Sequence, residues 1–178
     1  MTRSFSFDQL DAFVAGAVGP PGARTFYLQA RSGTQVVSFK AEKEQVGMLG
    51  RYLGQLASAM GPVEADRDVV GLVEPVEPEW AVGSLAVGVD EEAGVIHVTA
   101  EELTADEDTF GDDVTDELID ELLEIEPDDG AEARFTLTLG QAVAFAEAAQ
   151  DLMEAGRPPC RLCGRPIGPE GHACPRWN

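Results

Sequence analysis

The sequence predicts an α+β protein with an antiparallel sheet, one helix packed on that sheet in each half, and a C-terminal zinc knuckle. Three observations predict this fold class. Strand-like runs precede a helical pattern in the first half, the same order returns in the second half, and all three cysteines lie close together at the end of the chain. At 178 residues, the chain can bury a core of its own.

The first half contains three strand-like runs, at residues 13–18, 25–30 and 35–40, separated by a GPPG turn and by Ser32-Gly33. Short connections of this kind predict an antiparallel meander. From Glu42 onward the apolar residues follow helical spacing instead. A helix should therefore pack on the sheet through one apolar stripe, formed by Val46, Leu49, Leu53, Leu56 and Met60.

The second half repeats this order, with strand-like runs at residues 81–89, 95–100 and 134–138 and a helix at about 140–155. Thr138 and Gln141 stand at capping-box spacing, and glycine and proline follow the helix. Positions that lie 96 residues apart in the two halves carry residues of similar kind. We therefore hypothesise that one strands-then-helix unit has been duplicated. The pairs are Phe39 with Phe135, Gln45 with Gln141, Leu49 with Phe145, and Leu56 with Leu152.

We predict four segments: a first strands-plus-helix unit (1–60), an acidic proline-rich linker (61–79), a second strands-plus-helix unit (80–156) and a zinc knuckle (157–178). The second unit carries an acidic insertion at residues 101–132, which we expect to be mobile because it has charge without much apolar area to bury. Apolar residues every four positions indicate a short helix inside the insertion, at Val114, Leu118 and Leu122. Alternatively, residues 122–125 could pair with residues 134–138 as a strand.

The net charge of −21 is concentrated in the middle of the chain. Residues 64–132 hold 25 of the 33 acidic residues and a single base, Arg67, so this stretch carries −24 and the rest of the chain +3. A negative field repels phosphate backbones and anionic membranes. We therefore expect a protein partner with a basic surface, or an acidic middle that serves solubility alone, and disfavour nucleic acid and membrane. Nothing in the sequence fixes the oligomeric state.

The sequence contains no run of eighteen apolar residues, and its N-terminus lacks the apolar core and cleavage site of a signal peptide. The cysteine count also agrees with a reducing compartment, since three cysteines do not make an extracellular disulfide framework. We expect a soluble cytoplasmic protein.

The tail carries the one strong chemical signal in the sequence: Cys160, Cys163, His172 and Cys174. The first pair follows the C-x-x-C-G pattern, in which Gly164 permits the positive φ that aims two sulfurs at one centre. The second pair is two residues apart, which places both side chains on one face of an extended segment. Together they predict one structural Zn²⁺ in a closed Cys3His shell.

Other candidates for chemistry are weaker. A thioredoxin-like pair would open a helix, whereas Cys160 follows a helix end; an iron–sulfur cluster usually takes four cysteines. His97 lies on a strand face with no nucleophile spaced beside it, so we interpret it as structural. We predict no catalytic residue and no residue that binds an organic cofactor. Four arginines near the zinc ligands could touch nucleic acid or the chain's own acidic insertion: Arg157, Arg161, Arg165 and Arg176.

Two end motifs, FVAGAVGPPGARTFYLQAR and GRPPCRLCGRPIGPEGHACPR, together with the central acidic stretch, resemble the bacterial family called domain of unknown function 3090. The resemblance implies a small cytoplasmic protein and no established activity. It also implies that the four tail positions match the family's metal ligands.

The function that we expect is a non-enzymatic protein-binding or adaptor module that uses its sheet-and-helix body or its acidic stretch. The first alternative is an enzyme, or a subunit of one, with an active site between the halves. The second is weak nucleic-acid binding through the arginine-rich tail. An enzyme should show a pocket with converging polar groups, and an adaptor an exposed apolar patch.

Overall fold

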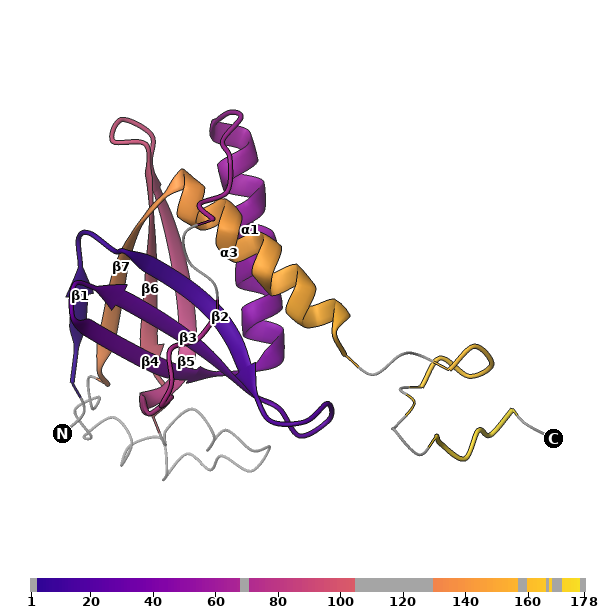
Figure 1. Cartoon of the computed structure of the whole chain (residues 1–178). Helices are drawn as coiled ribbons and strands as arrows, with labels where there is room; N and C mark the ends of the chain where they lie inside the picture. The colour runs from indigo at the N-terminus through magenta and orange to yellow at the C-terminus, as the bar shows by residue number, and fades with distance from the viewer. Residues whose placement is uncertain are drawn as a thin grey trace, which may run out of the picture.

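The computed structural model of the chain describes residues 3–67, 71–104, 130–156, 160–165, 167 and 171–176. Within these residues, seven strands and two helices follow in the order β1–β4, α1, β5–β7, α3 (Figure 1). The strands are β1 (Phe5–Phe7), β2 (Ala12–Val18), β3 (Thr25–Ser32), β4 (Gln35–Ala41), β5 (Pro78–Asp90), β6 (Val95–Glu102) and β7 (Glu132–Thr138). The helices are α1 (Lys43–Met60) and α3 (Leu139–Glu154). The predicted α+β class is confirmed.

The seven strands form one sheet in the order β1-β7-β6-β5-β4-β3-β2. The sheet is mixed, whereas the sequence predicted an antiparallel one: β4 pairs with β5 in parallel, and β1 pairs with β7 in parallel. The first parallel pair arises because α1 carries the chain back before β5 begins. The sequence did not predict β1. This strand has only three residues, too few to show an alternating pattern, and it pairs with β7 from the far end of the chain.

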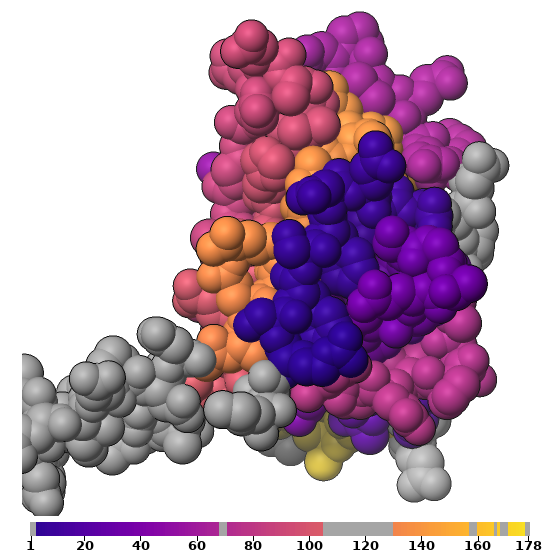
Figure 2. All heavy atoms as spheres, turned by 90° about the vertical axis from the view of Figure 1, so that its left-hand side faces the viewer, coloured from indigo at the N-terminus to yellow at the C-terminus, as the bar shows by residue number. Residues whose placement is uncertain are grey.

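The sheet is strongly curled around its core. Four strand spacings separate β1 from β4 in the sheet order, which in a flat sheet amounts to about 19 Å at about 4.8 Å each. The ring centroids of Phe5 and Phe39 are nevertheless 5.7 Å apart, and those of Phe39 and Phe135 also 5.7 Å. In Figure 2 the indigo N-terminal residues lie against orange residues of the second half. The two halves therefore share one aromatic core.

Both helices lie on the same side of the sheet (Figure 1), and the third residue of each is a glutamine whose side chain folds back on the N-cap residue. The Gln45 side chain accepts from the Glu42 backbone N–H (2.8 Å), and that of Gln141 accepts from the Thr138 N–H (3.0 Å). The Thr138 hydroxyl in turn accepts from the Gln141 N–H, which confirms the predicted capping box. In each half, three consecutive strands precede a helix, β2–β4 before α1 and β5–β7 before α3, with β1 as an addition to the first half. A duplication needs this order, and the duplication stays a hypothesis.

The two helices pack against each other through glycine and alanine. A Cβ added at Gly50 would lie 2.5 Å from the Ala149 Cβ, and one at Gly54 would lie 3.2 Å from the Ala146 Cβ. A Cβ at Gly47 would instead meet the flexible end of Met153, at 3.1 Å from its sulfur. Small residues thus let the backbones of α1 and α3 approach closely, while Val46, Leu49 and Leu53 of the predicted stripe are buried in the core.

We predict that Gly50→Ala lowers the free energy of unfolding by about 1–2 kcal/mol, because overpacking costs about 1–3 kcal/mol and better helix propensity returns up to about 1. Gly47→Ala on the same helix is the matched control, since Met153 can move aside, and it should be neutral or slightly stabilising. Urea unfolding of both variants checks this. Equal effects of the two substitutions would contradict the close packing at Gly50.

The predicted linker includes residues 71–77, here called the strap, which contact β2 and β3 of the meander. Gln29, fully buried on β3, donates to the Val73 carbonyl (3.0 Å) and accepts from the Val73 N–H (2.8 Å). Leu72 lies over Gly16, where an added Cβ would come within 2.4 Å of the leucine side chain. The strap then enters β5 at Pro78, earlier than the sequence predicted.

β6 extends to Glu102 and β7 starts at Glu132, so both ends of the predicted insertion belong to the sheet. Residues 105–129, with the predicted short helix and the alternative strand, lie outside the described residues. Neither helix in the described part of the chain has both the length and the hydrophobicity of a membrane span. The division into two units and a knuckle stays a prediction.

Candidate metal centre

The first ligand pair lies on a tight turn just beyond the end of α3. The Gly164 N–H donates to the Cys160 carbonyl (2.8 Å), and the Cys160 N–H donates to the Arg165 carbonyl (2.8 Å). Gly164 has a φ of 73°, in the left-handed region that the sequence required of it. The Leu162 N–H points at the Cys160 sulfur, 3.5 Å away. The turn therefore places the Cys160 and Cys163 sulfurs on the same side of the backbone.

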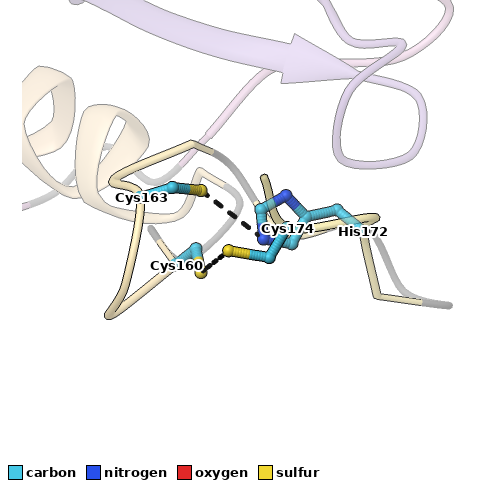
Figure 3. Close-up of side chains that lie close together, drawn as sticks. All are labelled: Cys160, Cys163, His172 and Cys174. Carbon is cyan, nitrogen blue, oxygen red and sulfur yellow. Dashed lines mark hydrogen bonds between the residues drawn. The ribbon is translucent and has the colours of Figure 1, made fainter. Parts of the chain in front are cut away.

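The second pair approaches from the other limb of the tail (Figure 3). The Cys163 sulfur lies 3.7 Å from His172 Nε2, and the Cys160 sulfur lies 3.8 Å from the Cys174 sulfur. One ligand atom from each of the four residues lies within 4.8 Å of the other three. The structure thus brings together all four residues that the sequence singled out as metal ligands.

The separations of 3.7 and 3.8 Å are close to those expected around a tetrahedral zinc ion. With Zn–S bonds of about 2.3 Å and Zn–N bonds of about 2.0–2.1 Å, the edges of a regular tetrahedron are about 3.8 Å between sulfurs and about 3.5 Å between sulfur and nitrogen. The shorter separations in the cluster match both values. A disulfide between Cys160 and Cys174 does not fit, because it needs sulfurs about 2.05 Å apart. All three cysteines are free thiols in the structure.

The surroundings of the thiols favour metal binding. The backbone N–H groups of Cys163 and Leu162, followed by the His172 side chain, lower the pKa of the Cys160 thiol to about 6. Burial raises the pKa of the Cys174 thiol instead, and the neighbouring cysteines add to that rise. This lowering of the pKa favours the thiolate form of Cys160, the form in which cysteine binds metal.

A hydrogen bond that the sequence did not predict ties the two limbs together: Arg176 Nη1 donates to the Leu162 carbonyl (3.0 Å). An arginine near the chain end gives no sequence signal for such a contact. Arg161 and Arg165 are exposed, and Leu162, between the first two ligands, is 50 % exposed. Arg157 lies outside the described residues.

The structure does not bring His97 to the cluster. His97 is exposed on β6, and its Nδ1 lies 3.1 Å from the Thr136 hydroxyl on the neighbouring strand β7. The structural role of His97 stays a prediction, and the four tail residues make up the candidate site.

The chain is therefore an α+β protein with a curled mixed sheet and a C-terminal Cys3His cluster that could hold a metal ion. Residues 5–174 match the model of the family described as "Protein of unknown function (DUF3090)". The match spans most of the chain, and the chain belongs to this family. No curated protein and no solved structure matches it.

Proposed function

We propose that this chain is a cytoplasmic, non-enzymatic protein-binding module whose tail is folded by one structural zinc ion. The observation that carries the zinc assignment is the convergence of four ligand atoms within 4.8 Å. Thiolate and imidazole are the ligands that zinc takes in structural sites, and three sulfurs favour zinc over magnesium or calcium.

The role of the zinc follows from its coordination number. Four protein ligands complete the tetrahedron, whereas a catalytic zinc keeps a position for water or substrate. The tail has few apolar residues to bury, so the free energy of metal binding supplies its folding. The described ligands are half-buried, and the turn of the first pair is held by hydrogen bonds within the tail itself.

Two open grooves on the body support the protein-binding role. The larger, about 830 Å³, lies between α1 and α3 on a floor of glycine, alanine and Met153. Its charged residues Arg51, Glu147 and Glu154 are exposed at the rim, so it gives no specific support to an active site between the halves. The smaller, about 340 Å³, is lined mainly by apolar side chains of α1 and β5.

Affinity capture tests this function. The full chain, tagged at its N-terminus and loaded with zinc, should retain a partner protein with a basic surface from the native cytoplasm in a stoichiometric amount. The partner should be lost at high salt, because charge steers the association. Failure to capture any stoichiometric partner across several growth conditions would contradict the proposal.

We further predict that the protein binds duplex DNA poorly at about 0.15 M salt, where the Debye length is about 8 Å. Four arginines neutralise at most about four phosphates, which supports only weak, salt-sensitive binding. The −24 stretch of the same chain adds repulsion. Fluorescence titration of duplex and single-stranded oligonucleotides checks this. Submicromolar binding that an Arg161→Ala, Arg165→Ala double variant abolishes would instead make the tail a nucleic-acid clamp.

A further inference from the structure

The sheet has an open strand edge beside α1. β4 pairs with β5 only at Ser38–Pro78 and Lys40–Ala81, because the chain leaves the sheet after Ala41 to enter α1. β5 continues to Asp90, paired with β6 along its other edge. Within the described part of the chain, no strand pairs with the β4-side edge of β5 beyond Ala81. Figure 1 shows the β5–β6 hairpin and the end of α1 at the same end of the molecule.

Gln45 shows that this edge accepts hydrogen bonds. Its side-chain Nε2 donates to the carbonyls of Val82 (3.1 Å) and Gly83 (3.0 Å), directly after the last β4 pairing. The glutamine amide therefore takes the place that the next strand residue would occupy. Further along β5, the edge runs through residues 84–89, a stretch of Ser, Leu, Ala, Val, Gly and Val with no charge and no proline.

An apolar groove follows the same edge. It is lined by Gln45, Met48, Leu49 and Tyr52 of α1 and by Gly83, Leu85 and Val87 of β5. Met48 is 57 % exposed and Tyr52 is 47 % exposed. These two side chains are one helical turn apart, outside the buried stripe of α1, so the fold itself does not need them to be large and apolar. An unprotected edge with apolar neighbours is a liability that native proteins usually block with charge, proline or a cover.

Charge around the groove favours a cationic occupant. Asp90, Glu91 and Glu92 stand at the hairpin end of β5, and Glu44 precedes Met48 by one turn of α1. The basic residues of α1 lie elsewhere: Arg51 lines the groove toward α3, and Lys43 Nζ lies beside Gly156. Lys40 follows the inward-facing Phe39 and so stands on the outer face of the sheet.

We propose that the β4-side edge of β5, from Gly83 to Asp90, receives an extended basic segment of a partner protein as an added strand. The backbone of the segment bonds to the edge, alternate apolar side chains enter the groove at Met48 and Tyr52, and lysine or arginine residues pair with the acidic hairpin end. This inference rests on the proposed protein-binding function and names its site and the chemistry of its partner.

The probe is a fluorescent peptide of about seven residues with alternating lysine and valine, a length typical of strands. Titrated with the zinc-loaded full chain, it should raise fluorescence anisotropy and protect the backbone amides of residues 84–89 from hydrogen exchange. A peptide with alternate backbone nitrogens methylated cannot bond to a strand edge, and one with glutamate in place of lysine lacks the charge match. Neither should bind.

Met48→Lys should weaken binding of the basic peptide by about tenfold or more, equivalent to about 1.4 kcal/mol. Gln55→Lys is the matched control, since it places the same charge on the same helix but in the other groove. Both positions are exposed, so neither substitution should alter the fold. Equal binding by both variants, or binding of the methylated peptide, would overturn the strand-addition site.

Two further outcomes separate this inference from the general function. If the Met48→Lys chain captures the same partner protein as the unaltered chain, the groove is wrong while the protein-binding function stands. If amides of residues 84–89 become protected as protein concentration rises, without peptide, the edge pairs with a second copy of the chain and the proposed partner class is wrong. Loss of partner and of peptide together, in Met48→Lys alone, supports the proposal.

Discussion

Replacement of Cys163 by serine is expected to release the zinc ion and unfold the tail, while the thermal unfolding of the body stays unchanged. Structural zinc sites bind with an apparent free energy of about 10–16 kcal/mol in finger peptides, and loss of one of four ligands removes much of it. Among the described residues of the tail, hydrogen bonds within the tail join Cys160 to Arg165, Gly164 to Cys160 and Arg176 to Leu162. Without the free energy of zinc binding, these hydrogen bonds alone would not keep the tail folded.

Zinc content and hydrogen exchange of the backbone amides of residues 160–176 measure the loss of zinc and the unfolding of the tail. Circular dichroism measures the thermal unfolding of the body. Leu162→Ser is the matched control, because it introduces serine at an exposed position of the same turn without removing a ligand. It should keep one zinc per chain. A body that melts together with the tail in Cys163→Ser would show that the knuckle belongs to the core.

Phe39→Ala should be the most damaging substitution in the body, lowering the free energy of unfolding by about 3–5 kcal/mol. Phe39 is fully buried, and its ring contacts Trp80 at 4.4 Å between centroids as well as Phe5 and Phe135 at 5.7 Å each. It thereby joins β1, β4, β5 and β7 at the centre of the curled sheet. For a domain of this size the melting temperature should fall by roughly 6–20 °C.

Val36→Ala provides the control on the same strand, since Val36 is 43 % exposed and its loss should cost under about 1 kcal/mol. Urea unfolding measures the free energy of unfolding of both variants. The two values can be compared directly if this free energy falls with urea concentration at the same slope in both. A cost below about 1 kcal/mol for Phe39→Ala would mean that the rings do not meet across the sheet and that the sheet is open.

Local patterns were sufficient to predict most of the elements. The meander of β2, β3 and β4, the stripe of α1 and the Thr138–Gln141 cap each depend on residues close together in sequence. The parallel pairs could not be predicted in this way, because the pairing of β4 with β5 depends on where α1 and the strap return the chain. The pairing of β1 with β7 joins opposite ends of the sequence.

The candidate metal centre was predictable because its four ligands lie within fifteen residues, where spacing alone restricts the geometry. The groove beside β5 was not. In the sequence, nothing distinguishes Met48 and Tyr52 from other surface residues of the helix. They line a groove only because β4 ends at Ala41 while β5 continues to Asp90. A difference in strand length becomes visible only when the strands are paired.

The most direct test of the zinc assignment is native mass spectrometry of the full chain, purified under reducing conditions without added metal. We expect a single species that carries one zinc ion per chain and loses it on acidification, as protons displace the metal from the thiolates. A reduced chain free of metal, a chain that carries iron, or one with a disulfide among Cys160, Cys163 and Cys174 would contradict it.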